Sequence, residues 1–251
     1  MIYFVGAGSG APDLITVRGA KLLGEADVIV YAGSLVNPAL LDYAKGDCAI
    51  YDSAKMTLEE VIAVMAPAAR EGKTVVRLHT GDPCVYGAHR EQMDALDRLG
   101  LAYEICPGVS SFCGAAAALK AEYTLPNVSQ TVILTRMEGR TPVPEREQIE
   151  SLAAHGATMV IFLSAGQLEK LSAQLIEGGY APETPAAIVY KATWPDEKVV
   201  RTTVGELAAA GAREGITKTA LITVGGFLGD SYDRSKLYDP AFTTGFREAS
   251  R

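Results

Sequence analysis

Three short segments combine glycine with charged or hydroxyl residues in patterns typical of ligand-binding loops. Residues 6–11 read G-A-G-S-G-A and match the G-x-G-x-x-[GA] fingerprint of dinucleotide-binding loops. Residues 79–83 read H-T-G-D-P, and Asp82 in this segment could accept a hydrogen bond from an ammonium or a ribose. Residues 107–111 read P-G-V-S-S, and their serines could cap a helix or present hydroxyl and N–H groups to a ligand.

Each of these segments also has a purely structural interpretation. The glycines suit a tight turn between a strand and a helix, and Asp82 could cap its own turn. Two features count against a nicotinamide cofactor. The strand that ends at Tyr31 carries no acidic residue at its tip for a ribose, and Pro12 and Asp13 delay the helix beyond the glycines.

A fourth segment holds two arginines in a loop rich in glycine and proline. Residues 136–144 read R-M-E-G-R-T-P-V-P and follow an apolar run. The planar guanidinium groups of Arg136 and Arg140 could each grip a carboxylate with two hydrogen bonds. The alternative is a solvated loop without a ligand.

Apolar runs alternate with helical patterns in the first half of the chain. We expect strands at 2–5, 28–31, 48–51, 74–78 and 103–106. Helical patterns cover 57–70, 92–99 and 112–120, and Thr57 and Glu60 have the spacing of a capping box. This alternation predicts a mainly parallel sheet, whose ligands bind at the carboxyl ends of the strands, where the three glycine segments stand.

The second half predicts a different sheet. Strands are expected at 131–134, 159–163, 187–190, 198–202 and 221–224. The strands near 185–191 and 197–203 leave no room for a helix between them, so they could form a hairpin in a mixed sheet. We therefore expect an α/β fold of two lobes with a ligand cleft between them. The expected bounds are 1–118 for the first lobe, 128–235 for the second and 236–251 for a C-terminal tail.

Composition excludes several classes of function. The 251 residues carry a formal net charge of −7, which counts against a nucleic-acid partner. No apolar run reaches membrane-spanning length, no signal peptide opens the chain, and the four cysteines form no C-x-x-C pair, so we expect a cytoplasmic protein. His79, Cys84 and His89 lie close together but fit no standard zinc spacing, so no metal is expected.

Taken together, the segments resemble the tetrapyrrole methylase family. The matching residues are 5–8 (V-G-A-G), 31–36 (Y-A-G-S-L-V), 81–83 (G-D-P), 107–111, 136–144 and 194–197 (W-P-D-E). The resemblance implies a homodimer of two-lobed chains that use S-adenosylmethionine to methylate a tetrapyrrole of cobalamin biosynthesis. Residues 31–36 and 138–144 most resemble members that methylate C11 of precorrin-4, with or without cobalt.

The resemblance also implies which residues bind each ligand. The cofactor residues would be Pro12, Gly81, Asp82, Val85, Tyr86, Ser110, Ser111, Leu163, Ala187, Thr219 and Ala220. The tetrapyrrole would lie in a trough formed by residues 6–13, 31–36 and the arginine loop, with contacts from Tyr31, Ser34, Arg136 and Arg140.

No general base is assigned. The methyl carbon of a sulfonium is already electrophilic, and holding two reactants in place can supply up to about 7–11 kcal/mol. Two rival classes remain: an RNA or protein methylase of the same fold, and a dinucleotide-dependent oxidoreductase. A methylase of the same fold that acts at another precorrin position is a third alternative.

Overall fold

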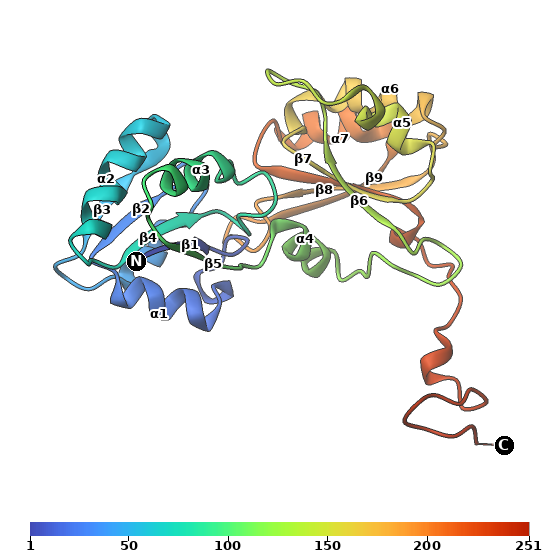
Figure 1. The fold of residues 1–251 in the computed structure, drawn as a ribbon. Coiled ribbons are helices and arrows are strands. Elements are labelled where there is room, and N and C mark those ends of the chain that lie inside the picture. Colours follow the sequence, from blue (N-terminus) through green and yellow to red (C-terminus); the bar gives the residue numbers. More distant parts are fainter. Residues whose placement is uncertain (251) are drawn as a thin grey trace. The chain divides into compact units, whose positions relative to one another are not determined.

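A computed structural model describes residues 1–250, which form two compact units (Figure 1). The first unit comprises Met1–Gly114 and Ala192–Asp196, and the second comprises residues 115–191 and the chain from Glu197 onward. The boundary after Gly114 falls inside a helix. The short segment 192–196, which the sequence places in the second lobe, packs with the first.

The first unit contains a parallel sheet of five strands in the order β3-β2-β4-β1-β5. The strands are β1 (Ile2–Gly6), β2 (Val28–Tyr31), β3 (Ala49–Asp52), β4 (Val75–His79) and β5 (Tyr103–Cys106). The α-helices are α1 (Val17–Glu25), α2 (Leu58–Arg70), α3 (Arg90–Arg98) and α4 (Ser111–Leu119), which crosses the boundary between the units. This arrangement confirms the parallel sheet that the sequence predicts.

Helices cover both faces of this sheet (Figure 1). Successive strand residues point to opposite faces, so Val5 packs with Leu23 of α1, whereas Phe4 packs with Met65 of α2 and Leu96 of α3. The predicted capping box starts α2: the Thr57 N–H donates to Glu60 Oε2 at 2.7 Å, and the Glu60 N–H donates to Thr57 Oγ1 at 3.3 Å.

The second unit contains a mixed sheet in the order β6-β7-β10-β8-β9. Its strands are β6 (Val132–Arg136), β7 (Thr158–Phe162), β8 (Pro185–Tyr190), β9 (Lys198–Thr203) and β10 (Ala220–Val224). Only β6 and β7 pair in parallel, and β8 and β9 form the expected antiparallel hairpin. Helices α5 (Ile149–Ala153), α6 (Leu168–Glu177) and α7 (Leu207–Glu214) pack on one face over a core that includes Ile161 and Leu171 (Figure 1).

Short 3-10 helices connect many of these elements. They span Pro12–Leu14, Pro38–Tyr43, Ser53–Lys55, Glu145–Glu147, Ala165–Gln167, Val204–Glu206, Gly226–Leu228 and Lys236–Tyr238. Across residues 1–250, none of the helices combines the length and apolar character that a membrane crossing requires.

Candidate functional site

The loops that follow β1, β4 and β5 meet at the carboxyl edge of the first sheet. The Gly8 N–H donates to the Gly81 carbonyl at 3.2 Å, and the Gly81 N–H donates to the Gly8 carbonyl at 2.9 Å. A Cβ atom on Gly108 would lie 2.3 Å from the Gly81 carbonyl oxygen and 2.7 Å from the Cα atom of Gly6. The backbones therefore approach so closely that only glycine fits at position 108.

Asp82 holds two of these loops together. Its Oδ1 accepts a hydrogen bond from the Cys84 N–H at 2.8 Å, and its Oδ2 accepts one from the Gly108 N–H at 2.7 Å. Partial burial works to raise the pKa of Asp82, but hydrogen bonds from Cys84 and Gly108 outweigh it and leave the pKa below its usual value. The contact with Cys84 is the turn contact weighed as an alternative above, and the contact with Gly108 adds a bond between loops.

The other cofactor residues expected in the first unit lie on the same loops or near them. Ser110 and Ser111 stand beside Gly81, since a Cβ atom on Gly81 would be 3.5 Å from the Ser111 nitrogen. Ser111 is the first residue of α4, and Tyr86 has a strained positive φ of 55°. Val85 shares the loop of Gly81, and Pro12 opens the 3-10 helix after the first glycine loop.

In the second unit, three of the four predicted cofactor residues share one edge of the sheet. Leu163 follows β7, and Thr219 and Ala220 stand at the start of the antiparallel neighbour β10. Leu163 and Thr219 have φ angles of 54° and 55°, and the Leu163 residue is 68% exposed. Strained backbone of this kind is concentrated at functional sites in proteins. Ala187 lies apart, fully buried in the middle of β8 opposite Thr223.

The predicted substrate residues Tyr31 and Ser34 lie at the end of β2 and in the loop after it, which two polar residues anchor. The Ser53 hydroxyl donates to the Tyr31 carbonyl at 3.0 Å, and Asp52 Oδ1 accepts from the Gly33 N–H at 3.1 Å. Ser34 is exposed beside these contacts. Sequence reasoning missed Asp52, although its position as the last residue of a strand and its acceptor oxygens are visible in the sequence.

The structure gives the two predicted arginines different roles. Arg136 Nη1 donates to the carbonyls of Met137 and Thr141 at 3.0 and 3.2 Å, and Nη2 donates to the Pro142 carbonyl at 2.9 Å. Arg136 therefore organises its own loop. Arg140 is exposed at the same loop, so its guanidinium is the better placed of the two to contact a ligand.

The tip of the β8–β9 hairpin contacts the first glycine loop inside the first unit. Thr193 Oγ1 accepts from the Ala11 N–H at 3.0 Å and shares a hydrogen bond of 3.0 Å with Ser9 Oγ. A Cβ atom on Gly10 would lie 2.2 Å from the ring of Trp194. Sequence reasoning did not find this contact, which joins residues more than 180 positions apart.

The three residues weighed for zinc give no metal-binding geometry. The rings of His79 and His89 have centroids 5.8 Å apart and contact each other edge to face. No set of three His, Cys, Asp or Glu side chains within residues 1–250 is arranged to hold a metal ion.

Comparison with known proteins agrees with the motifs. A family profile described as Tetrapyrrole (Corrin/Porphyrin) Methylases matches residues 1–208. The cobalt-precorrin-4 C(11)-methyltransferase of Methanocaldococcus jannaschii is 55% identical over 251 residues, which cover 100% of this chain and 97% of that protein. The enzyme of the same name from Priestia megaterium is 52% identical over 98% of this chain and 97% of its own.

Solved structures show the same fold. The X-ray structure of a cobalt precorrin-4 methyltransferase, a cobalamin biosynthetic enzyme, superimposes with a TM-score of 0.89 at 52% identity, covering 91% of this chain and 96% of that one. A uroporphyrin-III C-methyltransferase from Thermus thermophilus, complexed with S-adenosylhomocysteine, gives a TM-score of 0.75 at 27% identity over 90% of this chain and 98% of that one.

Proposed function

The chain belongs to the tetrapyrrole methylase family, and from this premise we propose that it methylates C11 of cobalt-precorrin-4 or precorrin-4 in cobalamin biosynthesis. It is an S-adenosylmethionine-dependent methyltransferase. The observation that carries the choice of substrate is identity of 55% over the whole chain to an enzyme named for this reaction. The alternatives of an RNA or protein methylase and of an oxidoreductase have no comparable support.

The residues fit a bound S-adenosylmethionine, which supplies an electrophilic methyl group on its sulfonium. Gly81 and Gly108 bring backbone groups of two loops together with Ser110 and Ser111, and Asp82 fixes the spacing of those loops. Leu163 is an apolar side chain held at a sheet edge in strained backbone, as a contact for an adenine or ribose face would be. The named cofactor residues in both units are part of this proposal.

Positioning is the catalytic contribution that we assign to the protein. Reaction needs the tetrapyrrole carbon in line with the methyl group, and rigid loops reduce the entropy lost in reaching that alignment. No side chain is assigned as a general base. Tyr31, Ser34 and Arg140 would orient the tetrapyrrole, and Arg136 would act by holding the loop of Arg140.

We also propose that the protein is a homodimer and that it is located in the cytoplasm, as its family resemblance implies. The net charge of −7 disfavours nucleic acid as a partner. Size-exclusion chromatography with light scattering measures the oligomeric state directly, and a monomer at micromolar concentration would remove that part of the proposal.

Activity is tested with purified enzyme and S-adenosylmethionine that carries a ¹³C-methyl group. With cobalt-precorrin-4, we expect mass spectrometry to find one added methyl group and NMR to place the label on C11. A parallel reaction with metal-free precorrin-4 shows whether cobalt is required. Methylation at another carbon, or methylation of uroporphyrinogen III alone, would overturn the proposed substrate.

A further inference from the structure

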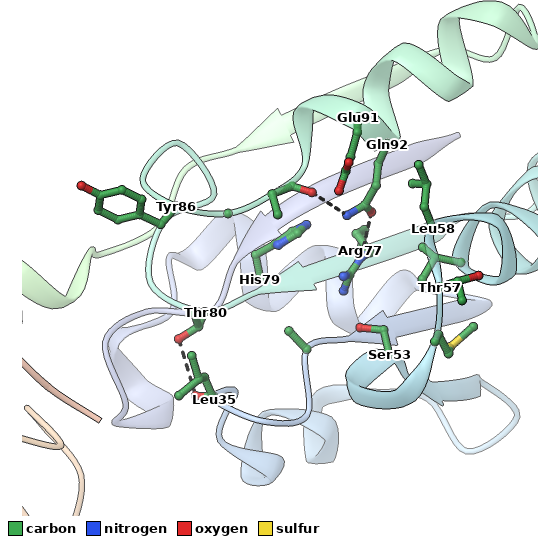
Figure 2. Close-up of a pocket in the computed structure, with 15 residues that line it drawn as sticks. Leu35, Ser53, Thr57, Leu58, Arg77, His79, Thr80, Tyr86, Glu91 and Gln92 are labelled. Atoms are coloured by element: carbon green, nitrogen blue, oxygen red, sulfur yellow. Dashed lines mark hydrogen bonds between the residues drawn. The ribbon is translucent and has the colours of Figure 1, made fainter. Parts of the chain in front are cut away.

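A separate pocket lies inside the first unit, beside the strand end that carries His79. The cavity has a volume of about 270 Å³ and is bounded by the loop after β2, the start of α2 and the start of α3. Figure 2 shows Arg77 and His79 of β4 on one wall, Ser53 and Thr57 below them, and Glu91 and Gln92 above. Its lining includes Ala32 and Leu35 of the 31–36 loop and Tyr86, but its charged wall of Arg77 and His79 has no ligand assigned to it so far.

Arg77 places a positive charge on the pocket wall without an opposite charge. It is 6% exposed, and its hydrogen bonds go to neutral acceptors: Gln92 Oε1 at 3.0 Å, the Val30 carbonyl at 3.2 Å and the Leu78 carbonyl at 3.4 Å. Burial lowers the pKa of Arg77 to about 10, so the group stays protonated at neutral pH. No carboxylate of residues 1–250 pairs with it. A buried charge of this kind is costly unless something pairs with it.

His79 adds a polar atom that has no partner. The side chain lies beside Arg77 on the pocket wall, the residue is 4% exposed, and the buried Nε2 atom makes no hydrogen bond within the described part of the chain. Burial, with the charge of Arg77 and nearby His89 adding to it, lowers the pKa of His79 to about 3. The imidazole is therefore neutral, and Nε2 can carry the proton and donate it in a hydrogen bond.

We propose that this pocket receives one carboxylate-bearing side arm of the tetrapyrrole, with Arg77 as its counter-ion and His79 Nε2 as a hydrogen-bond donor. The inference rests on the proposed function. A carboxylate would supply the negative counter-charge that the Arg77 guanidinium lacks, and it would accept a hydrogen bond from His79 Nε2. Ala32 and Leu35 line the pocket and belong to the 31–36 loop assigned to the substrate, so an arm that leaves the macrocycle over this loop has a direct entry.

The pocket is large enough for one side arm but too small for a whole tetrapyrrole. A volume of 270 Å³ equals that of roughly nine water molecules at about 30 Å³ each. An acetate or propionate group fits this space, and a macrocycle of four pyrroles does not. Glu91 is exposed at the pocket and carries the same charge as the arm, so it should weaken binding at this site.

Histidine NMR offers a direct readout because the chain has only three histidines, His79, His89 and His155. In full-length protein labelled with ¹⁵N-histidine, titration with propionate should shift the His79 ring signals to saturation, with a Kd in the millimolar range. His155 lies in the second unit and serves as an internal reference that stays unchanged. Propionamide has nearly the same shape without the charge and should leave His79 unmoved.

Two variants test the charge argument. Arg77→Gln should weaken propionate binding about tenfold to a hundredfold, with an unchanged circular dichroism spectrum as a check on folding. Glu91→Gln should tighten binding roughly two- to fivefold, and it keeps the proposal testable if Arg77→Gln does not fold. Glu104→Gln is the matched control, because it removes the same charge at an exposed position of β5 that does not line the pocket.

Uroporphyrin, a stable tetrapyrrole with acetate and propionate arms, separates this inference from the proposed function. A shift of His79 by uroporphyrin that Arg77→Gln abolishes supports the arm site. Uroporphyrin that binds without moving His79 overturns the arm site and leaves the methyltransferase proposal standing. Equal responses to propionate and propionamide, or an unchanged propionate affinity in folded Arg77→Gln and in Glu91→Gln, would also overturn it.

Discussion

The carboxylate of Asp82 accepts a hydrogen bond of 2.7 Å from the backbone N–H of Gly108, 26 residues further along the chain. The same carboxylate accepts from Cys84, so one side chain closes its own turn and joins it to the loop after β5. Glycine at position 108 makes this approach possible, because a Cβ atom there would meet backbone atoms of Gly81 and Gly6. The two loops to which cofactor contacts are assigned are therefore held together by this hydrogen bond and by close backbone packing.

Gly108→Ala should separate these loops. The added Cβ would lie 2.3 Å from the Gly81 carbonyl oxygen, and backbone cannot move aside as a flexible side chain can. We expect a loss of about 1–3 kcal/mol in the free energy of unfolding and a loss of S-adenosylhomocysteine affinity. Urea denaturation and isothermal titration measure the two effects. Gly46→Ala, where nothing lies within 4 Å, is the matched control, and equal behaviour of the two variants would refute the prediction.

Asp82→Ala should weaken S-adenosylhomocysteine binding about tenfold to a hundredfold, because a charged acceptor is lost. Asp82→Asn should be intermediate: its single oxygen can still accept from Cys84, but its amide nitrogen cannot accept from Gly108. Calorimetric titration of both variants gives the ranking. Wild-type affinity in Asp82→Ala would show that the residue is only part of a turn.

Arg140→Ala and Arg136→Ala should differ in kind. Loss of Arg140 should raise the KM for the tetrapyrrole about tenfold while S-adenosylhomocysteine affinity stays unchanged, since only a substrate contact is removed. Arg140→Lys should restore part of the loss, because an ammonium lacks the planar fork. Loss of Arg136 removes its hydrogen bonds to three loop carbonyls. This variant should therefore also have a lower melting temperature. Arg213→Ala, at an exposed position of α7, is the control for charge. An unchanged KM in Arg140→Ala would make Arg140 a solvated side chain.

His79 should make stability depend on pH between about 3 and 6.5. The unfolded chain protonates this imidazole near its ordinary pKa of 6.5, whereas the folded chain does so only near 3. In this interval the unfolded state binds more protons, so the free energy of unfolding falls as pH falls, by at most about 1.4 kcal/mol per pH unit. Urea denaturation from pH 7 to 5 should show a shallower slope for His79→Gln than for the wild type, and equal slopes would contradict the prediction.

Tyr180→Phe should destabilise the second unit. The buried Tyr180 hydroxyl donates a hydrogen bond to the Ala157 carbonyl, and burial raises the pKa of Tyr180 to about 12. Removal of the hydroxyl leaves that carbonyl without this donor, at a cost of about 1–3 kcal/mol. Thermal denaturation compares this variant with Tyr238→Phe, where the side chain is exposed, and equal melting temperatures would contradict the expectation.

Local patterns predicted the elements well. The capping box at Thr57 and Glu60 forms as its spacing indicates, and the short gap after β8 produces the expected hairpin. These features depend on residues close in sequence, where backbone geometry limits the choices. The alternation of strands and helices likewise predicted a parallel first sheet, because each parallel connection needs a crossover.

Contacts between distant residues were beyond reach of the sequence. Nothing in the segment 79–83 indicates that Asp82 pairs with Gly108, and Arg136 could equally have pointed to solvent instead of to its own loop carbonyls. Arg77 lies within a predicted strand, and nothing in the sequence distinguishes it from an ordinary exposed polar residue. The buried Arg77 donates to Gln92 Oε1, and the Gln92 amide in turn donates to the Ala88 carbonyl at 3.1 Å.

The hairpin tip at residues 192–196 also constrains the order in which the protein can mature during synthesis. Thr193 binds Ser9 and Ala11, so the first unit lacks one of its own parts until the chain has grown past residue 196. At about 5–20 residues per second, that part follows residue 114 by on the order of ten seconds. The glycine loop at residues 6–11 therefore lacks its contacts with Thr193 until the ribosome has synthesised most of the chain.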